Sequence, residues 1–468
     1  MIYDIAIIGA GSGGLSVAAA AAQFGQKVIL FEKGVMGGDC LNYGCIPSKA
    51  LIACARRAHD VRDAAKYGTG VAEPKTDFRK VHAYIHGVIA AIQPHDSVER
   101  FERLGVKVIQ KAAKFRDANS IETSDGVFRA RRIVIATGSR ASIPDIPGLA
   151  ETPYFTNETI FESKVLPGHL VIVGGGAIGM ELAQAYRRLG SDVTVIEAFE
   201  ALGRDDPEFT SIVLQCLRAE GVQILERASI RRISKSRAGV AVDVEGHGTV
   251  KGSHLLVAAG RSANVEGLNL EAAGVVYTAR GISVDKGLRS SQKHIYAVGD
   301  VAGGLQFTHV AGYHAGLVIR NALFRLPVRN RSDIIARVTY TDPELATIGL
   351  SEADARKEFG DAIKVVRAPF SENDRAQADG NTTGLVKVVV GKGGKILGVG
   401  IVGAQAGELI HSWVLAMGCG LKIQAIANMV APYPTLGEAN RRAAINYFSD
   451  LATNTHIRRV IRLLGLFG

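Results

Sequence analysis

One glycine pattern occurs twice in this 468-residue chain, each time between an apolar run and a stretch rich in Ala or Leu. The first copy, Gly9–Gly14, follows the apolar run Tyr3–Ile8. The second copy, Gly174–Gly179, follows Leu170–Val173. In both copies another apolar run comes next and ends at a glutamate. Apolar runs with strand periodicity on either side of a helical stretch predict two βαβ units.

The spacing within each unit is typical of dinucleotide binding. Glu32 lies 21 residues after Gly11, and Glu197 lies 21 residues after Gly176. The glycines permit a tight turn that a pyrophosphate can approach, the helix start offers free N–H groups, and the carboxylate accepts from ribose hydroxyls. A structural βα turn is the alternative for either copy alone. Two copies in this context predict two dinucleotide-binding domains.

Composition limits the remaining classes. With 47% hydrophobic residues, 54 Gly and 13 Pro, the chain is expected to form several folded domains and not a disordered or collagen-like polymer. The net charge of +10 comes from scattered basic residues, so we expect a solvated basic surface, or steering of an acidic partner, and no nucleic-acid binding. Five cysteines do not suggest a secreted disulfide framework, and no long apolar run predicts stable membrane insertion. We expect a cytoplasmic protein.

The segment Gly37–Lys49 holds two cysteines, Cys40 and Cys45, separated by four residues. They can form a disulfide if the turn brings their Cα atoms within about 7 Å. A thiol near a helix N-terminus and a lysine has a lowered pKa, which favours the thiolate that performs exchange chemistry. Two structural cysteines, or a metal site, are the alternatives. No second ligand pair lies nearby, so we expect no metal site.

On these residues the sequence resembles the flavin-dependent pyridine nucleotide–disulfide oxidoreductases, the group that contains dihydrolipoyl dehydrogenase, glutathione reductase and mercuric reductase. The resemblance covers essentially the whole chain, and Cys40–Lys49 is its most specific motif. The other segments that carry it are Gly9–Gly14, Ala136-Thr137-Gly138, Gly174–Gly179, Ala259-Gly260-Arg261, Val298-Gly299-Asp300 and Thr341-Asp342-Pro343-Glu344.

The resemblance implies an α/β fold with two Rossmann-like dinucleotide-binding domains and a C-terminal α+β dimerisation domain. The expected segments are an FAD-binding domain (1–147), an NAD-binding domain (148–270), a central segment that completes the FAD domain (271–333) and an interface domain (334–468). The resemblance also implies a homodimer with shared active sites.

The resemblance implies roles for single residues. Cys45 would face the flavin and Cys40 would exchange with substrate, while Lys49 would lie beside the flavin N5, paired with Glu181. The residues expected to contact FAD are Gly9, Gly11, Gly14, Glu32, Ala113, Thr137, Gly138, Asp300 and Thr308. Those expected to contact the nicotinamide cofactor or complete a cofactor site are Gly174, Gly176, Gly179, Glu197, Gly260 and Arg261. Because the Glu197 carboxylate repels a 2′-phosphate, NAD is expected over NADP.

The stretch Ala431–Glu438 departs from the family pattern, in which a His-Pro-Thr-x-x-Glu segment of the partner subunit supplies the acid–base. Tyr433 occupies the position of the catalytic histidine, and Glu438 is retained. A phenol with a pKa near 10 is a poorer base at neutral pH than an imidazole with a pKa near 6.5. Dihydrolipoamide turnover is therefore expected to be slow, or to use Tyr433 as a proton donor.

Three functions remain open at this point. The first is a dihydrolipoyl dehydrogenase-like enzyme that passes electrons between NAD(H) and a small dithiol or disulfide, or a protein-bound lipoyl group. The second is a mercuric reductase-like, NAD(P)H-dependent reductase of a thiophilic metal or another small disulfide, although Ile461–Gly468 holds no vicinal cysteine pair. The third is a flavoprotein subunit kept for binding or assembly.

Overall fold

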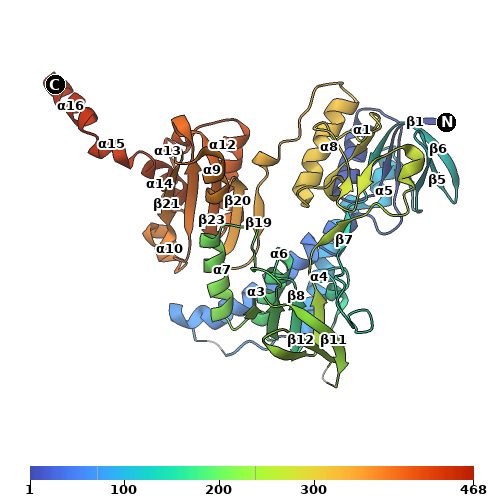
Figure 1. The fold of residues 1–468 in the computed structure, drawn as a ribbon, viewed down its shortest axis with the longest axis horizontal. Helices are drawn as coiled ribbons and strands as arrows, with labels where there is room; N and C mark the ends of the chain where they lie inside the picture. The colour runs from blue at the N-terminus through green and yellow to red at the C-terminus, as the bar shows by residue number, and fades with distance from the viewer. Residues whose placement is uncertain (71, 238, 468) are drawn as a thin grey trace. The chain divides into compact units, whose positions relative to one another are not determined.

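The structure of this chain, a computed structural model, describes residues 1–70, 72–237 and 239–467. These residues form two compact units (Figure 1). The first unit contains residues 1–175, 185–198 and 227–330, and the second contains residues 176–184, 199–226 and the segment from Arg331 onward. The four segments expected from the sequence stay a prediction, and their last residue, Gly468, lies outside the described residues.

A largely parallel sheet forms the centre of the first unit. β1 pairs in parallel with β2 and β6, β2 with β3, and β18 with β6, whereas β4 and β5 extend the sheet as antiparallel strands. Its strands are β1 (Ile2–Ile8), β2 (Val28–Phe31), β3 (Lys107–Ile109), β4 (Lys114–Asp117), β5 (Ser120–Thr123), β6 (Gly126–Ile135) and β18 (Ile295–Ala297). A strand covered on both faces must be apolar at successive positions, which explains the run at the start of the chain.

Alternate residues of β1 belong to two different hydrophobic clusters. Ile5 and Ile7 pack with residues of α1 (Ser12–Gln23) and α8 (Thr308–Ala322), which lie side by side on one face of the sheet (Figure 1). Ala6 and Ile8 face the other cluster, which includes Phe115 and Ile121. The remaining helices that lie wholly in this unit are α2 (Gly38–Asn42), α3 (Cys45–Asp63), α4 (Phe78–Ile92) and α5 (Val98–Arg103).

The second glycine turn also lies in a parallel sheet. β8 (His169–Val173) pairs in parallel with β9 (Asp192–Ile196) and with β14 (His254–Val257). Helix α6 (Ala177–Leu189) follows the turn. Three small antiparallel sheets of the first unit consist of β11 (Ile230–Ser236), β12 (Gly239–Val244) and β13 (Gly248–Gly252), of β7 (Ser139–Ala141) and β15 (Arg261–Ala263), and of β16 (Tyr277–Thr278) and β17 (Gly281–Ile282).

The second unit is built on an antiparallel sheet in the order β19-β20-β23-β22-β21. These strands are β19 (Arg337–Thr339), β20 (Glu344–Gly349), β21 (Lys364–Pro369), β22 (Leu385–Val390) and β23 (Ile396–Gly403); β10 (Gln223–Leu225) also lies in this unit. Its helices are α7 (Pro207–Ala219), α9 (Glu352–Phe359), α10 (Asp374–Ala378), α11 (Ala406–Leu409), α12 (His411–Gly418), α13 (Ile423–Ala427), α14 (Glu438–Asn446), α15 (Ser449–Thr453) and α16 (Thr455–Leu464).

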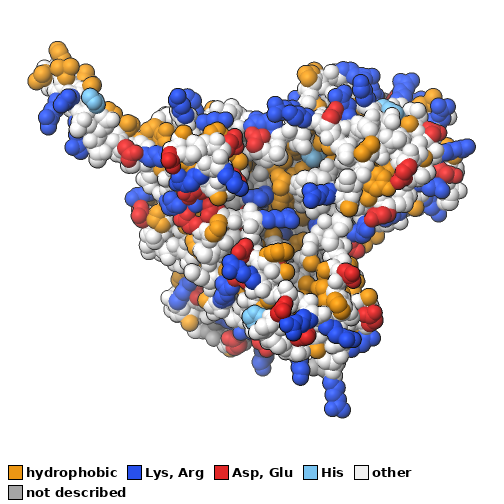
Figure 2. All heavy atoms as spheres, viewed as in Figure 1, with side chains coloured by type: hydrophobic (Ala, Val, Ile, Leu, Met, Phe, Trp, Pro, Cys, Tyr) orange, Lys and Arg blue, Asp and Glu red, His pale blue; other side chains and the backbone are white. Residues whose placement is uncertain are grey.

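The distribution of charged side chains on the surface agrees with the scattered charge expected from the sequence. On the face that Figure 2 shows, Lys and Arg side chains are interspersed with Asp and Glu. Among the described residues, no helix is both long and apolar enough to span a membrane.

Candidate active site

The first glycine turn has the shape that a pyrophosphate requires. Gly9 has φ +105°, and a Cβ there would lie 2.4 Å from the Ala136 carbonyl oxygen. A Cβ on Gly14 would lie 1.9 Å from the Gly9 oxygen, so neither position accepts a side chain. A Cβ on Gly11, in contrast, would have Gly38 Cα at 3.9 Å as its nearest neighbour. Two glycines therefore make the turn possible, and the third leaves the backbone open to a ligand.

The second turn repeats this geometry closely. Gly174 has φ +109°, and a Cβ there would lie 2.4 Å from the Ala258 oxygen. A Cβ on Gly176, in contrast, would have no atom of the described residues within 4 Å. Gly179 lies in the first turn of α6. Both turns thus lie against the end of a neighbouring parallel strand, with their middle glycine open.

The two predicted acidic residues occupy equivalent positions. The Ala10 N–H donates to Glu32 Oε2 at 2.6 Å, and the Gly175 N–H donates to Glu197 Oε2 at 2.6 Å. Each carboxylate therefore lies at the end of its strand, over the second residue of its glycine turn. This is where an acidic residue can accept from a ribose whose pyrophosphate rests on the helix start.

Arg261 links the predicted FAD residue Asp300 to the redox segment. The Arg261 guanidinium lies 3.1 Å from Asp39 and 3.8 Å from Asp300, and it is largely buried. Ser139 donates a hydrogen bond to Asp300, whose pKa is nevertheless raised because burial disfavours its charge. Asp300 is therefore held beside the start of α2 by a cation that the family resemblance had assigned only to a cofactor motif.

Other predicted cofactor residues lie in the same unit. The Thr137 hydroxyl donates to the Asn264 carbonyl oxygen at 2.7 Å, and Asn264 Nδ2 donates to the Thr137 oxygen at 2.9 Å. Gly138 and Gly260 both have positive φ, +68° and +129°, which favours glycine. Ala113 is buried just before β4. Their contacts to FAD stay a prediction.

The two redox cysteines lie on consecutive helices. Cys40 is in α2, and Cys45 is the first residue of α3, with Lys49 one turn further along. Between them, Gly44 lies so close to Asp39 that a Cβ would be 2.8 Å from its carboxylate. Both cysteines are free thiols here. The start of a long helix stabilises a negative charge at Cys45.

The surroundings of the two thiols make them chemically different. A hydrogen bond from Cys40, the Thr308 hydroxyl at 3.4 Å and the charge of Lys49 lower the pKa of Cys45 to about 6. The same interaction with Cys45, together with burial, raises the pKa of Cys40. Cys45 is therefore the thiolate of the reduced pair at neutral pH, and Cys40 carries the proton.

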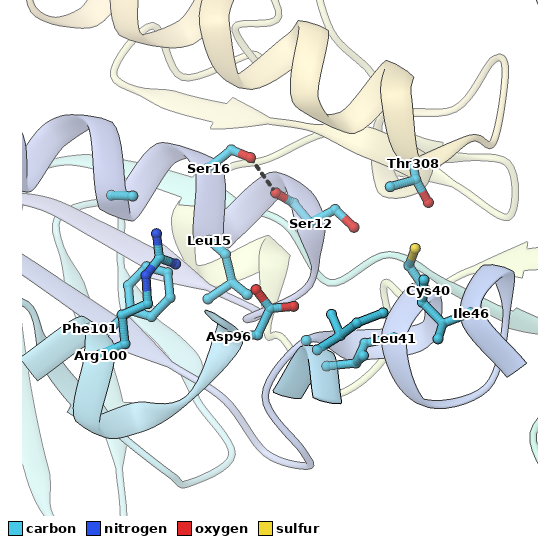
Figure 3. A pocket seen from close by; sticks show the side chains of 13 residues that line it. Ser12, Leu15, Ser16, Cys40, Leu41, Ile46, Asp96, Arg100, Phe101 and Thr308 are labelled. Carbon is cyan, nitrogen blue, oxygen red and sulfur yellow. Dashed lines mark hydrogen bonds between the residues drawn. The ribbon is translucent and has the colours of Figure 1, made fainter. Parts of the chain in front are cut away.

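A cavity of about 370 Å³ opens beside Cys40. Ser12 from α1, Cys40 from α2 and Thr308 from α8 lie at one end of it (Figure 3). Its remaining lining residues are Leu15, Ser16, Ala19, Gly37, Leu41, Ile46, Ile92, Asp96, Arg100 and Phe101. Cys45 is not among them, so of the two redox sulfurs Cys40 is the one that borders this cavity.

Asp96 and Arg100 give this cavity a polar wall that the sequence analysis missed. Asp96 ends the short 3-10 helix η2 (Gln93–Asp96), and burial raises the pKa of its carboxyl although Arg100 and His95 oppose this. Figure 3 shows both side chains at the cavity. No motif links them to Cys40, because they lie more than 50 residues further along the chain.

In the second unit, Tyr433 is bound to a carboxylate that sequence reasoning did not single out. Its hydroxyl donates to Asp374 Oδ2 at 3.0 Å. This bond, reinforced by the charges of Asp374 and Glu438, raises the pKa of Tyr433 above its ordinary value. Asp374 and Glu438 both line a cavity of about 360 Å³. Tyr433 is exposed and protonated at neutral pH, so it is placed to donate a proton and not to remove one.

Glu181 is buried in the second unit, where its Oε1 accepts from the Tyr340 N–H at 2.9 Å. Its predicted pairing with Lys49 stays a prediction.

Comparison with known proteins agrees with this geometry. Residues 3–315 match the family model described as pyridine nucleotide-disulphide oxidoreductase. Residues 335–444 match the dimerisation domain of the same family, in agreement with the predicted fold class and homodimer.

Individual relatives differ in their activities. The chain is 34% identical to a mercuric reductase of Bacillus cereus, over 96% of this chain and 72% of that protein. It is 36% identical to a dihydrolipoyl dehydrogenase of Staphylococcus aureus, over 94% of this chain and 96% of that protein. Among solved structures, a Cu(II) complex of the HOCl-induced flavoprotein disulfide reductase RclA from Escherichia coli superposes with a TM-score of 0.85 at 29% identity, covering 94% of this chain and 99% of that one.

Proposed function

The chain belongs to the pyridine nucleotide-disulphide oxidoreductase family, which uses FAD and NAD(P)H, and from this premise we propose that it is a reductase of a small disulfide or a thiophilic metal ion. In this proposal Cys45 and Cys40 would deliver to the acceptor the electrons that NADH and FAD supply when bound. The open glycine turns and the carboxylates of Glu32 and Glu197 support the proposal that the chain binds both cofactors. Glu197 favours NADH over NADPH, since it would repel a 2′-phosphate.

The chain's own residues have distinct tasks in this reaction. FAD, when bound, supplies hydride chemistry that links the two-electron nicotinamide to the cysteine pair. Thr308 and Lys49 hold the Cys45 sulfur as a thiolate. Cys40, which is protonated and lines the 370 Å³ cavity, is the sulfur available to an acceptor. Substrate exchange through Cys40 requires its proton to leave, and Ser12 and Thr308 are hydrogen-bonded to it.

The main support for reduction of an acceptor, as opposed to oxidation of a dithiol, is the hydrogen bond between Tyr433 and Asp374. Oxidation of a dithiol needs a base, whereas release of a reduced thiol needs a proton donor. The hydrogen bond to Asp374 raises the pKa of Tyr433, so Tyr433 stays protonated at neutral pH, cannot act as the base of the first task, and still carries a proton for the second. In the homodimer that the family dimerisation domain supports, Tyr433 and Glu438 would complete the site of the partner subunit.

Dihydrolipoyl dehydrogenase-like oxidation of a dithiol is the second candidate. The 36% identity to the Staphylococcus aureus enzyme of that name favours it. The mercuric reductases and the Cu(II) complex among the relatives favour a metal ion as acceptor.

The two directions can be compared in one experiment. Holoenzyme is assayed from about pH 6 to 10 for NADH oxidation by lipoamide, Hg(II) and Cu(II), and for NAD reduction by dihydrolipoamide, with wild type and Tyr433→His. We expect wild type to reduce an acceptor at neutral pH and to oxidise dihydrolipoamide only weakly. Tyr433→His should raise dithiol oxidation at neutral pH by about tenfold or more, because an imidazole can act as the base.

Cys45→Ser is the control that should abolish all four reactions. Wild type that oxidises dihydrolipoamide at pH 7 as fast as Tyr433→His would contradict the reducing direction and favour the second candidate.

A further inference from the structure

Two histidines and a glutamate of the first unit come together. His82 and His86 are one turn apart on α4, and Glu162 ends the 3-10 helix η3 (Ile160–Glu162). One ligand atom from each residue lies within 4.8 Å of the others. We propose that these three side chains bind a divalent zinc-type cation, a site independent of the proposed function.

The separations around His86 are slightly longer than those of a zinc coordination sphere. His86 Nε2 lies 3.8 Å from Glu162 Oε1, and it is hydrogen-bonded at 3.3 Å to the Phe161 carbonyl oxygen, a bond that it would give up to bind a cation. Ligands bound tetrahedrally at about 2.0–2.2 Å from zinc lie roughly 3.3–3.6 Å from one another. Small side-chain rotations are therefore enough to let His86 and Glu162 share a cation, with a carbonyl or a water as a further ligand.

His82 supplies an observation that an ordinary ion pair does not explain. Its Nε2 is buried and has no hydrogen-bond partner among the described residues. A buried imidazole nitrogen without a partner is costly, whereas the His86–Glu162 pair is partly exposed and contributes little by itself. A cation bound by all three residues would satisfy the nitrogen of His82.

The chemistry of this donor set favours zinc. Two imidazoles and one carboxylate with an open fourth position are a common zinc environment, and soft ligands are not required. The charged side chains that interact electrostatically with His82 are those of Lys164 and Glu162. The charge of Lys164 would oppose binding, and that of Glu162 would favour it.

A cation here would join α4 to the segment before β8. The opposite end of α4 is Ile92, which lines the cavity beside Cys40. The site therefore lies on a helix that borders the candidate substrate cavity.

Zinc stoichiometry tests the proposal. Full-length holoenzyme carrying Cys40→Ser and Cys45→Ser, which removes zinc binding by the redox thiols, is dialysed against Zn²⁺ and its metal content is measured. We expect one zinc per chain, which also raises the melting temperature by mass action. With Co²⁺ as the probe, the visible spectrum should show nitrogen and oxygen ligands without sulfur charge transfer.

His86→Ala and Glu162→Gln in the same background should each weaken zinc binding by more than the roughly 10–100-fold that loss of an outer-shell partner costs. His59→Ala, at a histidine of α3, is the matched control and should retain the metal. The Glu162 side chain is 64% exposed, so Glu162→Gln decides the question if the His86 variant does not fold. A parent protein that binds no zinc, or a Glu162→Gln variant that binds it unchanged, would overturn the proposal.

Discussion

At the residue scale, the two sulfurs of the redox pair differ in acidity because of what surrounds Cys45. Its pKa is lowered to about 6 by Cys40, Thr308 and Lys49, while that of Cys40 is raised. In the reduced protein without bound FAD, alkylation of Cys45 by iodoacetamide should therefore rise with pH through a midpoint near 6, because the thiolate is the nucleophile. Peptide mass spectrometry distinguishes Cys45 from Cys40, which should react only at much higher pH.

Thr308→Val tests how much of the lowered pKa of Cys45 comes from the Thr308 hydroxyl. Removal of the 3.4 Å contact should shift the Cys45 midpoint upward and slow alkylation at pH 6 by about threefold. Ser16→Ala, in the same cavity, is the control. An unchanged midpoint in Thr308→Val would show that Thr308 does not stabilise the thiolate.

The sequence predicted the cysteine pair because its spacing and its lysine are local. It did not predict the role of Thr308 at Cys45, since the two residues are 263 positions apart and only the approach of α8 to α3 brings them together. Asp96, Arg100 and Asp374 were missed for the same reason. The zinc-type site contradicts the expectation of no metal site if the proposal holds, because its glutamate is remote in sequence from the two histidines.

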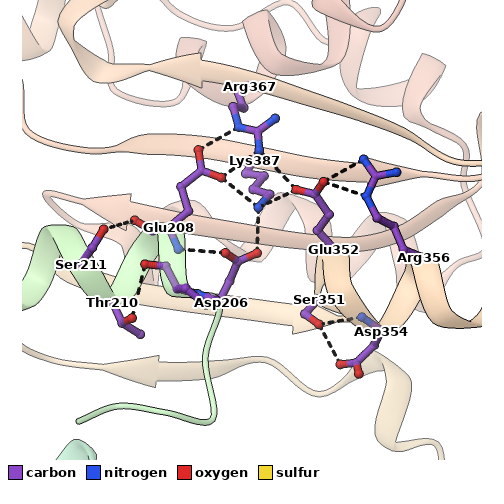
Figure 4. Close-up of polar contacts among 11 residues, drawn as sticks. Asp206, Glu208, Thr210, Ser211, Ser351, Glu352, Asp354, Arg356, Arg367 and Lys387 are labelled. Atoms are coloured by element: carbon purple, nitrogen blue, oxygen red, sulfur yellow. Dashed lines mark hydrogen bonds and ion pairs between the residues drawn. The ribbon is translucent and has the colours of Figure 1, made fainter. Parts of the chain in front are cut away.

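At the element scale, a buried lysine fixes α7 to the sheet of the second unit. Lys387 in β22 is 4% exposed and lies 2.7 Å from Asp206, 2.9 Å from Glu208 and 2.8 Å from Glu352 (Figure 4). Arg367 also binds Glu208 through two nitrogens. Three carboxylates thus explain a polar residue in the middle of an otherwise apolar strand. Asp206 directly precedes α7, Glu208 lies in α7, and Glu352 begins α9.

Lys387→Met should lower the free energy of unfolding by about 3 kcal/mol, since it removes the buried cation that the three carboxylates share and leaves only exposed arginines to offset their charge. Arg356→Met is the matched control, because the Arg356 side chain is 49% exposed and pairs with Glu352 at the surface; it should cost less than about 1 kcal/mol. Urea denaturation followed by circular dichroism measures both. If both variants lost the same free energy of unfolding, the buried ion pairs of Lys387 would stabilise the protein no more than a surface pair does.

The same cluster predicts a dependence on pH. Arg367 and Lys387 lower the pKa of Glu208 from 4.5 to about 2. The stabilisation from Glu208 is therefore complete above about pH 4.5 and is lost as the pH falls toward 2. Glu208→Gln should be less stable than wild type at neutral pH, and the difference should shrink through this window. A difference that is constant with pH would exclude the charge as its cause.

Strand positions were predicted more accurately than these contacts. The apolar runs Tyr3–Ile8 and Leu170–Val173, predicted as strands, end where β1 and β8 end, and each starts one residue after its strand does. Apolar periodicity reports which residues are buried, and glycine turns mark where strands end. Neither signal shows which distant polar side chains meet, so Lys387 and its carboxylates could not be predicted.

At the scale of the whole molecule, the remaining prediction is that two subunits share each active site. The family dimerisation domain covers residues 335–444, which include Tyr433 and Glu438, whereas Cys40 and Cys45 lie near the N-terminus. If Tyr433 acts on the cysteine pair of the partner subunit, a Cys45→Ser subunit damages the site of its own cysteines, whereas a Tyr433→Phe subunit damages the site of its partner's cysteines. Tyr433→Phe keeps the ring and removes only the hydroxyl, so its effect on the rate reports proton transfer. General acid catalysis commonly contributes at least about 100-fold to a rate.

Dimers mixed from the two variants distinguish shared from separate sites. The two proteins, carrying different affinity tags, are dissociated, mixed in equal amounts and allowed to reassociate, and the doubly tagged dimers are isolated. With shared sites, each mixed dimer joins both defects in one site and leaves the other intact, so it should recover about half of the wild-type rate of NADH-driven disulfide reduction. With separate sites, every site keeps one defect. The mixed dimer should then be no more active than the mean of its two parents, which would place Tyr433 beside the cysteines of its own chain.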